Sequence, residues 1–470
     1  MTIITNQLSL ENKHRDYHSL KYALCALESA ISSVQPDLLI RRALRRNCSK
    51  LLLTDIRGNK QEFDLDSFKS IFVVGAGKGT AKMAKAISHI LKGKITNGAI
   101  NVPYGNKIRL DSIAITEANH PIPDEAGVGG TKKIIDILKN TQGSDLVFVL
   151  ISGGGSALLP FPVGSLKLEE KKKITCKMLA AGAAIDEINV VRKHLSLIKG
   201  GQLVRFVKRG CTIISLILSD VIGDNIDTVA SGPTVPDVST FKDAAYILQK
   251  YHIFENKSLE KSSLRSIIKN GSEGYIAETP KPGNPVFDKV YNFLIGNNSI
   301  ACEKAVQSLR KNKIQAIYLG SSFGGQAIDF GRMLGKLAND FAISSLPIAF
   351  VLGGETTVKL NMKGKNGTGG RNQEAILSAA ANCRFLQRDD ISILSMGTDG
   401  IDGNSKAAGA FLTPKTIYLI QKKSINIKKY LNDHNSYTAL KKIDSLLLTG
   451  NTGTNVNDIA IICLMNRRNR

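Results

Sequence analysis

Continuous apolar runs recur along this chain, and each is followed by a turn or loop that contains glycine; after the first two runs, helical spacing follows that turn. Three such units span Ser70–Leu91, Asp145–Pro162 and Thr212–Asp237. Short apolar runs without polar alternation predict strands that are buried on both faces, as in a parallel sheet. Over residues 15–50, apolar residues recur at three- and four-residue spacing, which predicts helices.

The same alternation continues in the second half of the chain. A strand–turn–helix unit restarts at about Val290, and further apolar runs occur in QAIYLGSS, PIAFVLGGETTV, ISILSMGTDGID and TGNTGTNVNDIAIICLM. Because strand and helix signals alternate in both halves, both are predicted to be α/β. The turn Thr279–Pro285 is rich in proline and marks the predicted boundary, with one domain over residues 1–285 and a second over residues 286–470.

The composition is ordinary for a globular protein, with 43% hydrophobic and 22% charged residues in a chain of 470. The seven cysteines lie far apart without a CxxC pair, which argues against a disulfide framework and against a zinc site. The polar start lacks the apolar core of a signal peptide, and no apolar run reaches the roughly 18 residues of a membrane span. We therefore expect a cytoplasmic protein without a membrane partner.

The formal net charge of +23 is high enough to raise the question of a nucleic-acid partner. Two features weaken that interpretation, because the lysines are spread along the whole chain and the chain has no Trp and few other aromatic residues between them. A surface field that attracts small anions is the milder interpretation. A general preference for lysine is the alternative, and we expect no nucleic-acid partner.

The turn after the first apolar run reads GAGKG, with Gly75, Gly77 and Gly79 around Lys78. It is not GxGxxG, because position 80 is Thr, and it is not a Walker A loop, which needs four residues between Gly and Gly-Lys. Small residues would still let the backbone approach an anion, to which Lys78 would add a charge. An ordinary tight turn with an exposed lysine is the competing interpretation.

The turn after the second apolar run is Ser152-Gly153-Gly154-Gly155-Ser156. A nucleophile elbow of the form G-x-S-x-G is excluded at Ser156, since position 158 is Leu. Three successive glycines cost backbone entropy. A cradle of N–H groups for a phosphate or a carboxylate therefore explains this turn better than a plain turn does.

Acidic residues follow two of the predicted strands. Asp220 stands at the carboxyl end of the third apolar run, where ligands bind in open α/β sheets. It could accept a proton from a substrate hydroxyl or help to hold a metal. Asp399 and Asp402 lie on a glycine-flanked turn and suggest a hard cation such as Mg²⁺. A polar turn or a cap is the competing interpretation for each of these residues.

The stretch Gly353–Ala380 predicts a strand, a loop rich in glycine and lysine, and a helix that begins at Arg371. An arginine at the start of a helix can present a planar fork of donors to a phosphate or a carboxylate. The unpaired N–H groups of the first helical turn favour the same ligands. The later loop Thr449–Asp458 is rich in hydroxyl and amide side chains, which could surround a nucleotide or form a polar turn.

Eight short motifs occur in the order seen in one family. They are VVGAGKG, EANHPIPDEAG, LISGGGSALLPFP, INVVRKHLSLIKGGQL, LSDVIGDNIDTVASGPTVPD, GGETTV with GTGGRNQE, GTDGIDG and TGNTGTNVNDIAI. In these motifs the chain closely resembles the class II glycerate 2-kinases, whose C-terminal part is called the MOFRL domain. The resemblance runs from about residue 15 to the end of the chain.

The resemblance implies a fold and an activity. The fold would be two α/β domains, a Rossmann-like N-terminal domain and a MOFRL-type C-terminal domain, with the active site in the cleft between them. The activity would be ATP-dependent phosphorylation of D-glycerate at its 2-hydroxyl in the presence of Mg²⁺, which gives 2-phospho-D-glycerate and ADP. A homodimer is one option for the assembly.

The resemblance also implies roles for individual residues. Lys78, Asp220 and Arg371 match the expected catalytic constellation, in which Asp220 accepts the hydroxyl proton while Lys78, Arg371 and Mg²⁺ stabilise the transferred phosphoryl group. The candidate substrate-binding residues are Ser152, Gly153, Gly154, Gly155, Ser156 and Arg192. The candidate nucleotide-binding residues are Gly75, Gly77, Gly354, Glu355, Thr356, Asn372, Thr452 and Asn455. The candidate metal ligands are Asp399 and Asp402.

Two positions depart from the family's pattern. Asn404-Ser405-Lys406 stands where the family often has Pro-Thr-Asp, and Gly325-Gln326-Ala327 stands where Gly-Glu-Ala is common. Each difference removes a carboxylate, so metal or nucleotide binding near these loops could be altered.

Two other functions compete with the kinase. A hydroxypyruvate reductase would need a nicotinamide site, and the chain lacks a GxGxxG turn followed by an acidic residue about 20 positions later. The other alternative is an inactive basic relative that binds nucleic acid or other anions, and such a protein would show a steep salt dependence of binding.

Overall fold

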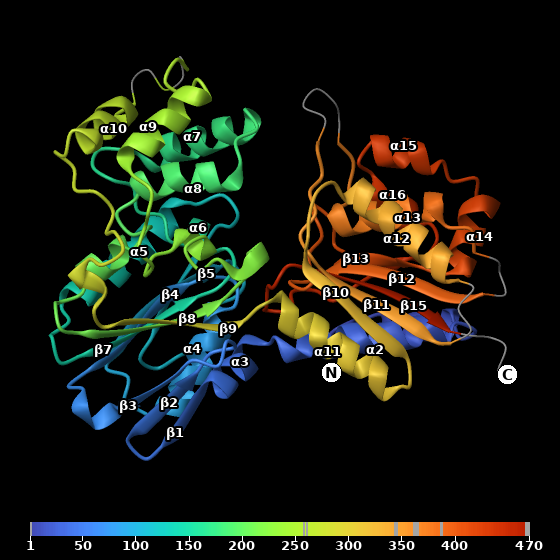
Figure 1. Ribbon diagram of the computed structural model, residues 1–470, viewed down its shortest axis with the longest axis horizontal. Coiled ribbons are helices and arrows are strands. Elements are labelled where there is room, and N and C mark those ends of the chain that lie inside the picture. Colours follow the sequence, from blue (N-terminus) through green and yellow to red (C-terminus); the bar gives the residue numbers. More distant parts are fainter. Residues whose placement is uncertain are drawn as a thin grey trace. The chain divides into compact units, whose positions relative to one another are not determined.

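The computed structural model describes residues 2–256, 259, 262–342, 346–360, 366–385 and 389–465. The predicted α/β class is confirmed, because strands and helices alternate in both halves of the chain. The chain forms two compact units, which Figure 1 shows in colours that follow the sequence. Unit 2 is the continuous segment Pro36–Gly296, and unit 1 combines Met1–Gln35 with Asn297–Arg470.

This division differs from the predicted one at both edges. The N-terminal segment belongs with the C-terminal part of the chain because the amide of Thr5 donates to the carbonyl of Leu448 at 2.7 Å, and because the amide of Ser19 donates to Asp390 Oδ1 at 3.0 Å. At the other edge, the strand Val290–Gly296 completes the sheet of unit 2 instead of starting a new domain.

Unit 2 contains a parallel sheet of six strands in the order β6-β5-β4-β7-β8-β9. These strands are β4 (Ile71–Ala76), β5 (Asn97–Pro103), β6 (Ala114–Ala118), β7 (Leu146–Ile151), β8 (Thr212–Leu218) and β9 (Val290–Gly296). Counted within this sheet, the order is 3-2-1-4-5-6, which is the order of the Rossmann fold. The order reverses between β4 and β7, and sheets of this kind bind ligands at the carboxyl ends of the two strands that meet there.

Apolar patterning explains why these segments form the centre of unit 2. Every residue of β7 and β8 is buried, as expected for strands with helices on both faces. α4 (Thr80–Leu91) follows β4, and α5 (Glu125–Lys139) packs on β5 and β6 (Figure 1). The other helices of unit 2 are α3 (Pro36–Ala43), α6 (Gly155–Leu158), α7 (Leu168–Ala180), α8 (Ile185–His194), α9 (Phe241–Lys250) and α10 (Leu264–Ser272).

Two smaller parts complete unit 2. Helices α7 to α10 share an apolar core of their own, separate from the core under the sheet. A three-stranded antiparallel sheet is formed by β1 (Leu44–Asn47), β2 (Lys50–Thr54) and β3 (Lys60–Asp64). The predicted helical region therefore ends at Ala43, and the arginines that follow it lie on a strand.

Unit 1 contains a mixed sheet of six strands in the order β10-β11-β15-β12-β13-β14. These strands are β10 (Gln315–Phe323), β11 (Ile348–Gly354), β12 (Asp390–Gly397), β13 (Gly409–Leu412), β14 (Leu446–Leu447) and β15 (Asp458–Met465). β10 and β11 are parallel, and the other neighbours are antiparallel. The central position of β15 places its first residue, Asp458, between the carboxyl ends of β11 and β12.

Helices cover both faces of the sheet of unit 1. Figure 1 shows α2 (His18–Ser33) and α11 (Asn298–Lys311) on one face, with α12 (Ala327–Phe341) and α13 (Arg371–Asn382) on the other. The remaining helices are α1 (Gln7–Lys13), α14 (Pro414–Lys422), α15 (Ile427–Asn432) and α16 (Ser436–Lys441). α13 begins at Arg371, as the sequence predicts.

Within the described ranges, no single helix is both long enough and apolar enough to cross a bilayer. The bent pair of α2 and α3 meets the criteria together, by length and composition alone.

Candidate active site

The turns after β4 and β7 are fastened to each other at the point where the strand order reverses. The amide of Lys78 donates to the carbonyl of Gly153 at 2.9 Å, and the amide of Gly79 donates to Ser152 Oγ at 3.0 Å. Gly77 has a φ of +144°, and a Cβ atom at this position would lie 2.1 Å from Ser152 Oγ. Glycine is therefore required here for the close approach of the two turns.

These contacts occupy backbone N–H donors of the GAGKG turn. Gly77 donates its amide to the carbonyl of Asn101 at 3.2 Å, so the amides of residues 77–79 all bond within the protein. A Cβ atom on Gly75 would lie 2.1 Å from the carbonyl oxygen of Leu150 on β7. These glycines serve close packing, and their role in nucleotide binding stays a prediction.

The Ser152–Ser156 turn, by contrast, keeps donors available. Within the described part of the chain, the amides of Gly153, Gly154 and Ser156 have no hydrogen-bond acceptor, whereas Gly155 donates to the carbonyl of Ser152 at 3.1 Å. Gly154 has a φ of +80°, which a residue with a side chain adopts only under strain. Adjacent free N–H groups of this kind support the predicted anion cradle.

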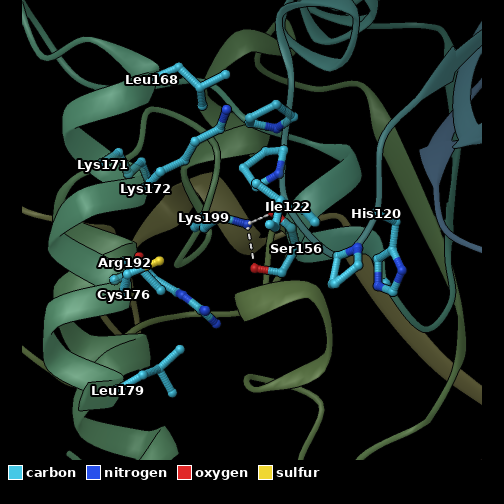
Figure 2. Close-up of a pocket in the computed structure, with 16 residues that line it drawn as sticks. His120, Ile122, Ser156, Leu168, Lys171, Lys172, Cys176, Leu179, Arg192 and Lys199 are labelled. Carbon is cyan, nitrogen blue, oxygen red and sulfur yellow. Dashed lines mark hydrogen bonds between the residues drawn. The ribbon is translucent and has the colours of Figure 1, made fainter. Parts of the chain in front are cut away.

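A cavity of about 390 Å³ opens beside this turn. Its walls come from α7, from Arg192 on α8, from the loop at residues 120–123 and from the Ser152–Ser156 turn. Figure 2 shows Lys199 among these walls, with its amino group directed at Ser156. Lys199 Nζ donates to both the carbonyl and the Oγ of Ser156 at 2.9 Å, so this buried cation holds the turn in place.

The polar lining of this cavity is cationic. Lys171, Lys172, Arg192 and Lys199 face it, and none of the described lining residues is a carboxylate. Burial and the charge of Arg192 lower the pKa of Lys171 to about 7. Burial also lowers the pKa of Lys199 well below its ordinary value, and it lowers the pKa of Arg192. A cavity with this lining favours a small anion.

Lys78 and Asp220, the predicted catalytic residues of unit 2, are outside the lining of this cavity. A Cβ atom on Gly154 would lie 2.8 Å from the His120 ring and 3.5 Å from Lys78 Cγ, so the side chain of Lys78 passes next to the cavity wall. Asp220 follows β8 directly and is partly exposed. Lys78 and Asp220 therefore both follow strands at the carboxyl edge of the same sheet.

Arg371, in unit 1, is held by two carboxylates of its own chain. Nε donates to Asp458 Oδ2 at 2.5 Å, Nη2 donates to Asp458 Oδ1 at 3.0 Å, and Nη1 donates to Glu355 Oε1 at 2.7 Å. Burial alone would lower the pKa of Arg371, but the charge and hydrogen bonds of Asp458 outweigh burial and raise it. The side chain is 31% exposed, and these bonds use three of the five guanidinium N–H groups.

Asp402 holds the start of α13. Its Oδ1 accepts from the amide of Asn372 at 3.1 Å and its Oδ2 accepts from the amide of Gln373 at 2.9 Å, while the side-chain amides of both residues donate to the same carboxylate. Burial raises the pKa of this carboxyl to about 6. These contacts favour a role in capping α13 over the predicted role as a metal ligand.

The other predicted metal ligand is Asp399, whose Oδ1 accepts from the amide of Ile401 at 3.0 Å. In the ranges that the structure describes, no three His, Cys, Asp or Glu side chains are grouped so as to hold a metal ion. Mg²⁺ binding therefore stays a prediction.

The predicted nucleotide-binding residues of unit 1 gather around the ends of β11, β12 and β15. Gly354 ends β11, and Thr356 is buried just after it. The side-chain oxygen of Asn372 accepts from Ser395 Oγ at 2.6 Å, and Thr452 Oγ1 donates to the carbonyl of Thr398 at 2.6 Å. Asn455 accepts from the amide of Asn457 at 3.3 Å. The structure brings this set together with Arg371, while Gly75 and Gly77 belong to unit 2.

The residues that depart from the family's pattern have structural partners here. Asn404 fastens the loop before Arg371, because its Oδ1 accepts from the amide of Gly369 at 2.9 Å and its Nδ2 donates to the carbonyl of Gly367 at 3.1 Å. Ser405 Oγ accepts from Gln373 Nε2 at 2.7 Å. Gln326 Nε2 donates to Thr357 Oγ1 at 3.2 Å. The substitutions are thus accommodated by local hydrogen bonds.

Sequence reasoning missed several residues of these sites, among them Asp458, Lys171 and Lys199. Asp458 is the bidentate partner of Arg371, and its position as the polar residue that begins a long apolar run was the available signal. Lys171 lines the cavity, but it stands in the charged run Glu169–Lys173, which looks like a solvated helix face.

Comparison with known proteins agrees with the motifs. Residues 22–265 match the family described as a domain of unknown function, DUF4147, and residues 348–458 match the MOFRL family. A glycerate 2-kinase of Pyrococcus horikoshii is 40% identical over 445 residues, which cover 94% of this chain and 96% of that protein. This chain belongs to the MOFRL-type glycerate 2-kinase family.

Two further proteins are similar to this chain over most of its length. The crystal structure of glycerate kinase from Thermotoga maritima matches this chain with a TM-score of 0.79 and 34% identity, over 95% of this chain and 99% of that one. A protein of Agrobacterium vitis that carries the provisional name hydroxypyruvate reductase is 39% identical over 396 residues, or 83% of this chain and 86% of that protein. The family predicted from the eight motifs is confirmed.

Proposed function

We propose that this chain is an ATP-dependent kinase that phosphorylates the 2-hydroxyl of D-glycerate and releases 2-phospho-D-glycerate and ADP. The observation that carries the proposal is the cavity beside the Ser152–Ser156 turn, which presents cations and free amides and no carboxylate among its described lining residues. A small hydroxy acid with one carboxylate matches this donor set. Membership of the glycerate 2-kinase family supports the same activity.

The chemistry assigned to the chain is a single phosphoryl transfer. In the proposal, Asp220 accepts the proton of the 2-hydroxyl while that oxygen forms a bond to the γ-phosphorus, and the bond from the γ-phosphorus to the leaving ADP oxygen breaks. Lys78 and Arg371 offset the negative charge on the transferred group. The two N–H groups that Arg371 has left after its three bonds to carboxylates are the donors it would use.

Mg²⁺ enters this proposal as part of the substrate, bound to the phosphates of ATP. Asp399 is the carboxylate proposed to contact it, and no step is assigned to Asp402, whose oxygens already accept from Asn372 and Gln373. Gly75, Gly77, Gly354, Glu355, Thr356, Asn372, Thr452 and Asn455 remain the proposed nucleotide contacts.

Two reactions with purified protein separate this function from its competitor. With D-glycerate, ATP and Mg²⁺ the protein is expected to release ADP, which a coupled assay measures. With hydroxypyruvate and NADH it is expected to cause no oxidation of NADH. The provisional name of the Agrobacterium vitis relative makes the second reaction the necessary comparison. NADH oxidation without any ATP use would overturn the proposal in favour of a reductase.

A further inference from the structure

The buried amino group of Lys171 has no carboxylate partner among the residues that the structure describes. Lys171 lies on α7 with 9% of its surface exposed, and its Nζ donates to one acceptor, the carbonyl of Leu195, at 3.0 Å. The charge that acts on it most is Arg192, another cation of the cavity lining. Among the described residues, no carboxylate forms an ion pair with Lys171, Arg192 or Lys199. Burying a charge without a partner is costly, which is why the pKa of Lys171 falls to about 7; an anionic ligand in the cavity would stabilise its charged form.

A neighbouring lysine shows how the fold treats a cation that has only a structural role. Lys193 is buried on α8, next to Arg192 in the sequence, and its Nζ lies 3.1 Å from Asp227 Oδ2 and 3.3 Å from Asp237 Oδ1. The fold thus supplies two carboxylates to Lys193 and none, in the described chain, to Lys171. The difference between them is that Lys171 lines the cavity, where a ligand can bring the missing charge.

We propose that Lys171 is a substrate-binding residue, which receives the carboxylate of the 2-hydroxy acid together with Arg192. This inference rests on the proposed function and adds to it a residue from α7, opposite the Ser152–Ser156 turn. Leu168 of the same helix also lines the cavity and adds apolar surface to this wall, which strengthens a charge–charge contact. Lys171 has two N–H groups left for the ligand after its bond to Leu195.

Binding of the acid at Lys171 is expected to be coupled to the uptake of a proton. Burial lowers the pKa of Lys171 to about 7, and a bound carboxylate raises it again, so the complex takes up a proton between about pH 7 and 9. The other titratable groups that face the cavity are His120, Lys172, Cys176, Arg192 and Lys199. Lys199 already has three oxygen acceptors, on Ser156 and Ala230, which match the three N–H groups of an ammonium ion.

The direct test measures binding of D-glycerate, without nucleotide, by calorimetry at pH 7.0 and 8.5. Wild-type protein is expected to lose about tenfold in affinity between the two pH values as Lys171 deprotonates. Lys171→Met is expected to bind roughly tenfold more weakly at pH 7.0 and to show no such loss at the higher pH. Lys173→Met makes the same change at an exposed position two residues along α7 and is expected to match wild type.

If Lys171→Met does not fold, a second measurement on the wild-type protein alone still tests the proposal. Calorimetry at pH 8 in two buffers of different ionisation enthalpy gives the number of protons bound, which is expected to approach one for D-glycerate. Glycerol, which lacks the carboxylate, is expected to cause no uptake. Uptake with ADP or inorganic phosphate but not with D-glycerate would overturn the proposal, because the anion at Lys171 would then be a phosphate.

Turnover separates failure of this inference from failure of the proposed function. If wild type phosphorylates D-glycerate, Lys171→Met is expected to raise KM for D-glycerate at least tenfold while kcat and KM for ATP change little. A Lys171→Met protein with wild-type KM and the wild-type pH profile would overturn the role of Lys171 and leave the kinase activity standing. If wild type phosphorylates no hydroxy acid, the proposed function fails, and the calorimetry still decides whether Lys171 binds a carboxylate.

Discussion

Both carboxylate oxygens of Asp458 accept hydrogen bonds from the guanidinium of Arg371, from Nε at 2.5 Å and from Nη2 at 3.0 Å. Asp458 begins the central strand β15, and Arg371 begins α13, so this pair ties the start of the helix to the middle of the sheet. The proposed catalytic arginine is therefore positioned by a buried partner 87 residues away in the sequence.

Asp458→Asn is expected to weaken both the fold and the activity. The substitution leaves the partly buried guanidinium with a neutral partner, and the loss of one member of a buried ion pair costs about 3 kcal/mol of unfolding free energy. Turnover is expected to fall at least tenfold as Arg371 loses its orientation. Urea unfolding and the ADP-release assay measure the two effects.

Glu355→Gln is the control for this pair, because the side chain of Glu355 is 40% exposed and contacts the same guanidinium through Nη1. Its loss of stability is expected to stay below about 1 kcal/mol. Equal losses in the two variants would show that Asp458 is not the residue that positions Arg371.

Lys78→Ala is expected to lower kcat about a hundredfold or more while the melting temperature stays within a few degrees. The backbone amide of Lys78 bonds to Gly153, and this contact does not depend on the side chain. An ADP-release assay and thermal unfolding of the same preparation measure the two quantities. Turnover close to wild type in a folded Lys78→Ala protein would remove this residue from the mechanism.

Gly77→Ala is expected to destabilise the protein by about 3 kcal/mol or more, since the new Cβ would overlap Ser152 Oγ and its backbone carbonyl. Gly58→Ala is the matched control, because Gly58 also has a positive φ, +88°, but nothing lies within 4 Å of the position of its Cβ. Backbone strain alone is expected to cost Gly58→Ala roughly 1 kcal/mol. Chemical denaturation measures the free energy of unfolding of both variants, and an equal loss in the two would refute the close packing of the two turns.

Asp402 is expected to make stability depend on pH between about 4 and 6. Its carboxyl has a pKa of about 6 in the folded protein, above the ordinary value of 3.8, so the folded state binds the proton more tightly than the unfolded state. Because of Asp402, the free energy of unfolding is therefore expected to rise as the pH falls from about 6 to about 4. Asp402→Asn is expected to remove that slope, of about 1 kcal/mol per pH unit, from urea unfolding curves. Identical slopes in both proteins would contradict the raised pKa.

The sequence predicts the Rossmann-like sheet well because its buried strands are continuous apolar runs and its turns carry glycines that only close backbone packing explains. It does not predict that residues 2–35 join unit 1, since that depends on hydrogen bonds to Asp390 and Leu448, far along the chain. The inward position of Lys171 is hidden for a similar reason, because the run Glu169–Lys173 is polar throughout and only the packing of α7 on α8 decides which lysine is buried.

The central claim is transfer of the γ-phosphoryl group of ATP to the 2-hydroxyl of D-glycerate, and the position of the phosphate in the product tests it most directly. Incubation of the purified protein with D-glycerate, ATP and Mg²⁺, followed by phosphorus NMR with proton coupling, distinguishes the two monophosphates. A 2-phosphate couples to one carbon-bound proton and gives a doublet, and this is the predicted result. A triplet from 3-phosphoglycerate, or ATP left unconsumed, would contradict the account.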